Sequence, residues 1–366
     1  MLKRFSVTGF KNFESEFSID FSDVRDYKFH TECVTDGLLN TAIIYGKNAV
    51  GKTNFGLALF DIVSHLTNNN VTPNLYDYYL NVNNNGKEAH FKYEFVFDGD
   101  EISYEYSKSE KNSLTSELLT LNGKEMFRRY DSMYIAEYSG LAELAPSFNW
   151  EHNPEMSLLK YFYYNSPSNV NHPLSKMMIF VSNMLWFRSL DENRFIGYKE
   201  KSNDYLTFML SNNNYLNEFN ALLNNAGIHD SVVAKKDIDG EVRLYFDTKR
   251  PMPFWNVASS GTKALYTFYY WYKTAPNVSF MYIDEFDAFY HYELAETIVK
   301  MLQKMEGFQK VFTTHNTNLL SNRIMRPDCY FILSSDKLTA FANATDRELR
   351  EGHNLEKLYM SGEFNE

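Results

Sequence analysis

Eight consecutive residues carry the groups that a phosphate chain needs. The segment GKNAVGKT fits the pattern GxxxxGK[ST], and its residues are Gly46, Lys47, Asn48, Ala49, Val50, Gly51, Lys52 and Thr53. Backbone N–H groups of such a loop cradle phosphates, while Lys52 would neutralise the β and γ oxygens and the Thr53 hydroxyl would hold Mg²⁺. By background glycine usage, a chance match has a probability on the order of one in a hundred. We therefore predict nucleotide binding here, with the adjacent Asn54 included.

A second group of side chains would support hydrolysis. The apolar run Ser279–Ile283 is followed by Asp284 and Glu285, so both carboxylates would emerge where a buried strand ends. Asp284 would hold Mg²⁺, directly or through water, and Glu285 would polarise the attacking water. The same residues could instead cap the following helix, as acidic residues at such turns often do. On these residues alone, both interpretations stay open.

Two further segments flank these carboxylates in the chain, one before them and one after. Ser260 and Gly261 precede an aromatic helical stretch, so the serine, the glycine amide and the helix N-terminus could bind an anion; a plain N-cap is the alternative. His315 follows a strand-like run ending in Thr313–Thr314, which would place an imidazole at a sheet edge, within reach of a γ-phosphate. A structural role for this single histidine stays open.

A parallel sheet is needed to bring these residues together, and the hydrophobic pattern predicts one. Thr41–Tyr45 has the pattern of a buried strand leading through the glycine loop into a helix. Ser279–Ile283 and Lys310–Thr313 flank a helical stretch at His291–Met305, which is the βαβ order of a parallel sheet. We expect further strands in antiparallel hairpins at Leu2–Phe21 and His90–Tyr106, and a last strand at Tyr330–Leu333.

The length of the chain predicts more than one folding unit. Its 366 residues correspond to about two domains, or to one domain with a large insertion. Residues 146–228 have mostly helical spacing, as at Tyr205–Leu223, and we expect a helical insertion lobe there. Residues 1–145 and 229–366 would then form the two parts of one α/β lobe. The second part would begin with two strands joined at Asp239–Gly240 and return the chain to the sheet.

Composition narrows the class of protein. Hydrophobic residues make up 44% and charged residues 23%, which is typical of a globular chain. Two cysteines in no ligand-spaced pattern exclude a disulfide framework or a zinc cluster and favour a reducing compartment. With no apolar signal stretch and no apolar run long enough to span a bilayer, we expect a cytoplasmic protein without a membrane partner. The net charge of −11 argues against general attraction to nucleic acid, although a local basic patch is compatible with it.

Four motifs in order resemble the ABC-type ATPase heads of SMC proteins, RecF and the overcoming-lysogenisation-defect (OLD) group: the glycine loop, Ser-Ser-Gly-Thr-Lys, Ile-Asp-Glu and Thr-Thr-His-Asn. The resemblance implies a P-loop NTPase of α/β class, with a mixed sheet and N-terminal antiparallel hairpins. It also implies an ATP-dependent homodimer or higher homo-oligomer, in which Ser260 and Gly261 of one subunit close over ATP held by the other. In this pattern Glu285 is the catalytic base, Asp287 the D-loop aspartate and His315 the switch histidine.

The similarity is greatest to the stand-alone ATPases of bacterial abortive infection (AbiL-like), and it extends to Arg326-Pro327-Asp328 and the ending Asn354–Gly362. It implies an ATP- and Mg²⁺-dependent switch in antiphage defence. Because the chain ends soon after the ATPase part, we expect any nuclease or toxin activity to come from a separate effector encoded nearby. A RecF- or SMC-like role in DNA repair or chromosome maintenance, and a scaffold that hardly hydrolyses ATP, stay open as alternatives.

One element of this family pattern is missing. The heads normally have a Q-loop glutamine between the phosphate loop and the signature serine, but the only glutamines here, Gln303 and Gln309, both follow Glu285. Asn183 and Glu137 are candidate substitutes, and spacing selects neither. We therefore expect slow hydrolysis. An aromatic residue near the loop, such as Phe13 or Tyr45, is a candidate contact for adenine.

Overall fold

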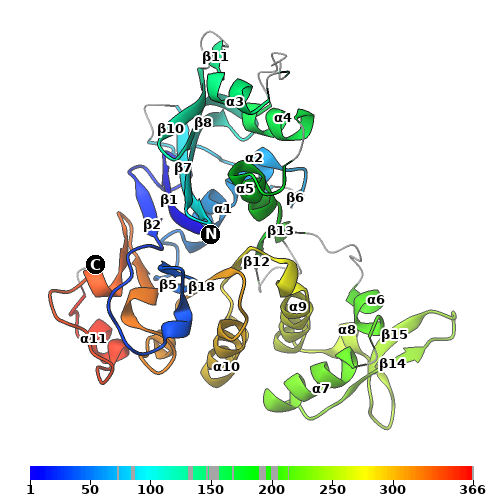
Figure 1. Ribbon diagram of the computed structural model, residues 1–366. Helices are drawn as coiled ribbons and strands as arrows, with labels where there is room; N and C mark the ends of the chain where they lie inside the picture. Colours follow the sequence, from blue (N-terminus) through cyan, green and yellow to red (C-terminus); the bar gives the residue numbers. More distant parts are fainter. Residues whose placement is uncertain are drawn as a thin grey trace.

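Two sheets and a smaller lobe make up the fold in this computed structural model (Figure 1). The structure describes residues 1–71, 74–83, 87–130, 135–145, 147, 156–166, 169–188, 195–198, 205–212 and 214–364. Within these ranges, no helix combines the length and the apolar character needed to cross a bilayer.

A seven-stranded antiparallel sheet contains the N-terminal hairpins. Its strands, in spatial order, are β11 (Ile135–Glu137), β10 (Lys124–Tyr130), β9 (Ser113–Leu121), β8 (Asp100–Glu110), β7 (Ala89–Phe97), β1 (Leu2–Thr8) and β2 (Phe17–Asp20). In β7, alternate residues from Ala89 to Phe95 are buried, as expected for a strand with one face on the core. Asp98 and Gly99 close the β7–β8 hairpin with φ of 54° and 90°. Both predicted hairpins are confirmed, whereas β9 to β11 were not foreseen.

An eight-stranded mixed sheet carries the predicted site residues. Its strands, in spatial order, are β20 (Leu338–Ala340), β19 (Tyr330–Leu333), β5 (Thr41–Tyr45), β18 (Gln309–Thr314), β17 (Phe280–Asp284), β12 (Met184–Arg188), β13 (Phe195–Gly197) and β6 (Asn70–Val71). The five neighbours from β19 to β12 are parallel, so their carboxyl ends share one edge. The predicted parallel strands are confirmed, and β20 follows the strand that we expected to be the last.

Helices fill the space between and beside the sheets (Figure 1). The helix α1 (Lys52–Leu59) contacts both β1 and β17, and α5 (Pro173–Ser182) packs on β7 and β8. The helix between β17 and β18, α10 (Tyr292–Gln303), is the predicted crossover. The other helices here are α2 (Asp61–Leu66), α3 (Ser139–Leu144), α4 (Leu158–Asn165), α9 (Ser260–Thr274) and α11 (Leu355–Met360). A two-stranded ribbon of β3 (Val34–Thr35) and β4 (Leu38–Leu39) completes this part.

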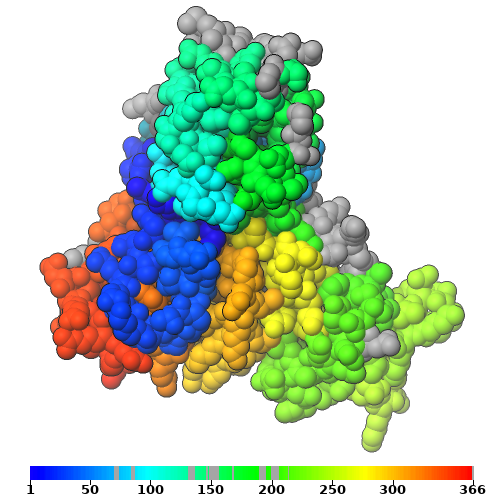
Figure 2. All heavy atoms as spheres, in the orientation of Figure 1, coloured from blue at the N-terminus to red at the C-terminus, as the bar shows by residue number. Residues whose placement is uncertain are grey.

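The smaller lobe follows β13 in the chain. It comprises α6 (Tyr205–Leu210), α7 (Tyr215–Asn225), α8 (Phe254–Val257) and a separate three-stranded sheet of β14 (Val232–Lys236), β15 (Val242–Phe246) and β16 (Met252–Pro253). Figure 2 shows these residues projecting from the body of the molecule beside α9. The predicted strand pair around Asp239–Gly240 is confirmed, but it does not return to the main sheet.

The segment 146–228, expected as a helical insertion lobe, contains strands as well as helices. Its residues 184–188 and 195–197 are strands of the eight-stranded sheet, and α4 and α5 lie beside the seven-stranded sheet. The stretch Tyr205–Leu223, where helical spacing was noted, is divided between α6 and α7. The strand β12 was not expected because the run Met177–Phe187 is mostly apolar, and periodicity alone does not distinguish a buried strand from a buried helix.

Candidate functional site

The glycine loop connects the buried strand β5 to α1 at the carboxyl edge of the parallel strands. Its tip, Lys47–Ala49, is exposed. A Cβ atom on Gly46 would lie 2.9 Å from the Leu333 carbonyl oxygen, and one on Gly51, whose φ is 108°, would lie 2.4 Å from Asn12 Nδ2. Both positions therefore require glycine.

Asn12 fastens this loop from the other sheet. Its Nδ2 donates to the Val50 carbonyl (3.2 Å), and its Oδ1 accepts from Asn54 Nδ2 (2.7 Å). From the sequence, Asn12 was expected only as part of the hairpin Leu2–Phe21, with no role at the site. The structure shows that Asn54, predicted to bind nucleotide, also supports the loop through Asn12.

Lys52 begins α1 and folds back over the loop. Its Nζ donates to the carbonyls of Gly46 (2.7 Å) and Lys47 (3.0 Å). Burial lowers its pKa, and the carboxylates of Glu285, Asp284 and Asp287 act in the opposite direction. No side chain caps the helix at Gly51, so the first N–H groups of α1 remain available to an anion.

Thr53 and Asp284 are brought together from positions 231 residues apart. The Thr53 hydroxyl donates to Asp284 Oδ2 at 2.7 Å, and the Thr313 hydroxyl donates to Oδ1 at 2.7 Å. Burial raises the pKa of Asp284, opposed by these hydrogen bonds and by Arg188. Hard oxygen ligands from one hydroxyl and one carboxylate, completed by phosphate oxygens and water, are what Mg²⁺ takes in nucleotide sites, so the donor set fits this ion.

Glu285 lies at the end of β17 in a strained backbone conformation. Its φ is 48°, in the left-handed region, where a non-glycine residue costs on the order of 1–3 kcal/mol. Its backbone N–H donates to Thr313 Oγ1 at 2.8 Å. With the backbone in this conformation, the carboxylate contacts β12, where Arg188 Nη2 donates to Glu285 Oε2 at 2.7 Å.

Arg188 is the functional candidate that sequence reasoning missed. In the parallel β12–β17 register it lies opposite Asp284, and its Nε is 3.6 Å from Asp284 Oδ2. Its side chain is 26% exposed, and the residue ends β12 at the edge of the sheet where β17 ends in Asp284. No local signal marked it, because the residue falls in the segment expected to be helical.

The remaining predicted residues occupy two places. Asp287 and His315 lie at the carboxyl ends of β17 and β18, where the Thr314 hydroxyl donates to Asp287 Oδ2 (2.7 Å) and burial raises the Asp287 pKa. The His315 side chain is exposed. Ser260 and Gly261 begin α9, and a Cβ atom on Gly261 would lie 3.0 Å from the Phe289 carbonyl oxygen.

The cap of α9 is Ser259, whose Oγ accepts from the Thr262 N–H at 3.1 Å. Ser260 is exposed and does not make this cap. Among the described residues, no hydrogen bond or ion pair joins Ser260 or Gly261 to the loop Gly46–Thr53 of the same chain. The structure therefore does not bring these two residues to the loop of their own subunit.

Neither candidate for the missing glutamine lies at the site. Asn183 precedes β12 at the opposite end from Arg188, and five residues of strand correspond to about 16 Å. Glu137 is in β11, at the outer edge of the other sheet. Of the candidate adenine contacts, Phe13 is fully buried against Phe17 and Phe55 and is unavailable, because its ring belongs to the core.

Comparisons with known proteins identify a family for this chain. A family model described as "AAA domain, putative AbiEii toxin, Type IV TA system" matches residues 42–321, a span that includes the glycine loop, Ser260, Gly261, Asp284, Glu285, Asp287 and His315. No curated protein is significantly similar in sequence. An SMC head domain from Thermotoga maritima has 15% identity and a TM-score of 0.43, covering 93% of this chain and 98% of that one. An SMC head bound to the C-terminal winged-helix domain of ScpA has 12% identity and a TM-score of 0.45, covering 93% and 97%.

Proposed function

The chain belongs to this family of AAA domains, and from that premise we propose that it is an ATP- and Mg²⁺-dependent ATPase that acts as a dimeric nucleotide switch. The observation that carries the proposal is the meeting of Thr53 and Asp284 at 2.7 Å beside the glycine loop. Glu285 is the next residue, so a group able to act as a base adjoins the pair able to hold the metal.

In the proposed reaction, bound MgATP supplies a phosphoanhydride bond whose cleavage needs charge stabilisation and an oriented water. Lys52 and the loop N–H groups would bind the phosphates, and Thr53 and Asp284 would hold the metal. Glu285 would accept the proton of the attacking water, with His315 donating a hydrogen bond at the same edge. We propose slow turnover, because Glu285 is engaged by Arg188 and must leave that ion pair to act.

We propose a dimer because the signature residues Ser260 and Gly261 make no contact with the glycine loop of their own subunit among the described hydrogen bonds and ion pairs. Ser260 and Gly261 begin a 15-residue helix, are at or near the surface, and do not bond to their own loop. Their hydroxyl, amide and helix N-terminus are suited to a γ-phosphate held by a second subunit. Asp287 would lie near the same contact, since it follows Glu285 in the turn after β17.

The test is the solution mass of the Glu285→Gln protein with and without ATP and Mg²⁺. Blocking hydrolysis should trap the dimer, so we expect the mass to double with ATP. Adding Ser260→Arg should abolish the doubling, while Ser211→Arg, at an exposed serine of the smaller lobe, should not. A mass that does not respond to ATP, or a response that survives Ser260→Arg, would contradict the shared site.

For the biological role, we propose antiphage defence through a partner effector, supported by the toxin–antitoxin description of the family. Cells expressing the chain with its neighbouring genes should resist phage, and Lys52→Ala should remove the resistance. Full resistance from this chain alone would contradict the need for an effector. ATP-dependent binding of duplex DNA that weakens with salt would instead favour a role of the RecF or SMC kind.

A further inference from the structure

A buried ion pair joins α2 to the seven-stranded sheet. Lys108 Nζ, on β8, lies 2.6 Å from Asp61 Oδ1, and both side chains are almost fully buried. The hydroxyls of Tyr79 and Tyr106 also donate to the Asp61 carboxylate, each at 2.8 Å. Asp61 is thus fully neutralised and hydrogen-bonded, which is the condition for a carboxylate to remain charged in a core.

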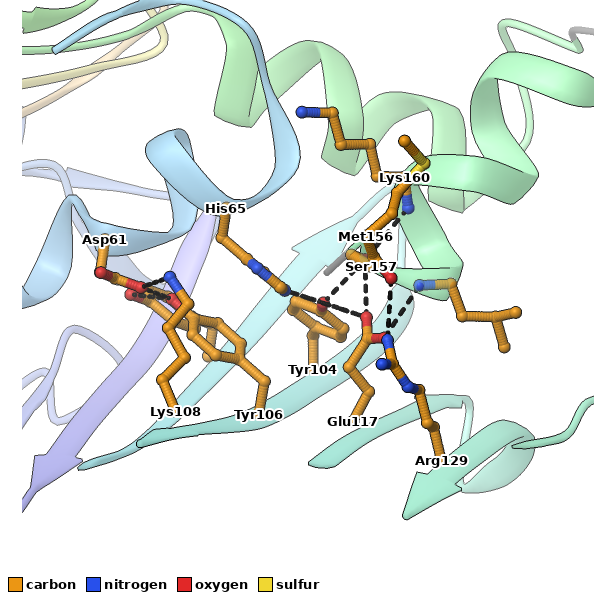
Figure 3. Close-up of polar contacts among 12 residues, drawn as sticks. Asp61, His65, Tyr104, Tyr106, Lys108, Glu117, Arg129, Met156, Ser157 and Lys160 are labelled. Atoms are coloured by element: carbon orange, nitrogen blue, oxygen red, sulfur yellow. Dashed lines mark hydrogen bonds and ion pairs between the residues drawn. The ribbon is translucent and has the colours of Figure 1, made fainter. Parts of the chain in front are cut away.

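A second buried carboxylate, Glu117 on β9, belongs to the same group of polar contacts, as Figure 3 shows. Glu117 accepts from Tyr104 Oη and Ser157 Oγ, both at 2.6 Å, and from the Leu158 N–H at 2.8 Å. Arg129 supplies its counter-charge, with Nη1 at 3.5 Å from Glu117 Oε2. The two buried carboxylates are therefore matched by two buried cations, and neither is left to balance a further positive charge.

His65 lies between the two pairs and is held neutral. Its Nε2 is 2.7 Å from the Tyr104 hydroxyl. Burial lowers its pKa well below the usual value, and the charges of Lys108, Lys160 and Arg129 lower it further. Lys108 and Arg129 are paired with Asp61 and Glu117, so Lys160 is the cation of these three that has no carboxylate partner among the described residues.

A pocket of about 310 Å³ opens beside this cluster. Three lysines, Lys108, Lys111 and Lys160, line it together with His65 and Ser157, and its described lining contains no carboxylate. Lys160 Nζ donates only to neutral acceptors, the Thr67 carbonyl and Asn68 Oδ1, both at 2.9 Å. Lys111 Nζ is 5.8 Å from the Tyr76 ring centre, and within the described ranges neither Lys111 nor Lys160 has an acidic partner.

From this balance of charges we propose that the pocket binds the phosphate group of a small phosphorylated molecule, with Lys111 and Lys160 as its counter-ions. A phosphate monoester carries about two negative charges near neutral pH, which two unmatched ammonium groups would balance. The volume is at the lower end of the roughly 300–1,000 Å³ of small-molecule pockets. In a chain with a net charge of −11, a cavity with two lysines that lack an acidic partner among the described residues is a selective place for an anion.

The site is separate from the glycine loop. Its residues come from α2, β8, the β8–β9 turn and the start of α4, whereas the loop lies at the carboxyl edge of the other sheet. The α2 helix nevertheless follows α1 after a single residue, Phe60, and α1 begins with Lys52. Binding of a ligand to the pocket can thus be measured in a protein whose glycine loop is impaired. The effect of that ligand on ATP hydrolysis can then be measured in the unmodified protein.

The experiment is calorimetric titration of the full chain carrying Lys52→Ala, so that the glycine loop does not compete for the probe. Inorganic phosphate should bind with a dissociation constant tighter than about 1 mM. Replacing both lysines, Lys111→Gln with Lys160→Gln, should weaken it by at least about tenfold. Lys249→Gln, at an exposed lysine of the smaller lobe, should leave it unchanged. Thermal unfolding of each variant would verify that it is folded.

A second arm separates two sources of the phosphate group. A 5′-phosphorylated tetranucleotide and its 5′-hydroxyl form are titrated under the same conditions. Binding of inorganic phosphate as tight as that of the phosphorylated tetranucleotide supports a small phosphorylated molecule. Much tighter binding of the phosphorylated tetranucleotide would overturn the proposal in favour of a nucleic-acid end. Equal binding of the two tetranucleotides, phosphate binding weaker than about 1 mM, or no effect of the lysine substitutions would overturn the proposal.

Discussion

The substitution Gly56→Ala tests how tightly the loop helix must fit the sheet that carries the acidic residues. Gly56 lies within α1, where a Cβ atom would be 2.6 Å from Tyr282 Cε1 and 2.8 Å from Trp186 Nε1. Both rings are fully buried in the strands β17 and β12. The Tyr282 hydroxyl donates to the Lys52 carbonyl at 3.0 Å, so its ring cannot shift without weakening that bond.

One stabilising effect and two destabilising effects set the change in the free energy of unfolding. Alanine is favoured over glycine inside a helix by about 1 kcal/mol. Overpacking a filled core costs about 1–3 kcal/mol. Loss of the Tyr282 hydrogen bond costs about 0.5–1.5 kcal/mol. The net loss of stability is about 0.5–3.5 kcal/mol, which for a chain of this length lowers the melting temperature by roughly 1–5 °C.

Thermal unfolding and ATP titration of the Gly56→Ala protein check this estimate. We expect a lower melting temperature together with weaker ATP binding, because a displaced α1 moves Lys52 and Thr53. Gly352→Ala is the matched control, since a Cβ atom there would meet no atom within 4 Å, and it should be neutral. A Gly56→Ala protein that melts at or above the temperature of the unmodified protein would refute the reasoning, because helix propensity would then outweigh the contact.

Two other substitutions test buried charges. Lys108→Met should lower the free energy of unfolding by about 3–5 kcal/mol, because it leaves the buried Asp61 carboxylate without its counter-ion. Adding Asp61→Asn should recover part of that loss. Strictly additive losses in a double-mutant cycle measured by urea unfolding would contradict the pairing. Burial lowers the pKa of Lys310 to about 8, against 10.5 in the unfolded chain. The unfolded chain therefore binds more protons between these pH values, and the folded state gains stability as pH rises through the window. Lys310→Met should remove that gain, so a stability difference between the two proteins that stays constant from pH 7 to 10.5 would count against it.

The sequence by itself determined the glycine loop and its neighbours. The strand β5, the loop and α1 are contiguous, so the change from a buried strand to helical spacing, with glycine between them, is written in one short segment. The βαβ unit of β17, α10 and β18 was recognisable for the same reason. It followed that Asp284 and His315 would lie at one sheet edge, because parallel strands end on the same side.

Only the tertiary structure decided which distant residues meet at that edge and elsewhere. Arg188 reaches Glu285, 97 positions away, because β12 pairs with β17 in one register, and the period of an apolar run does not specify a partner strand. Asn183 was excluded by the same register, since it lies at the other end of β12. The lysine pocket depends on how α2 and α4 pack on the antiparallel sheet. Local spacing indicates helices and strands, whereas the packing of segments far apart in the chain decides which charged side chains surround a site.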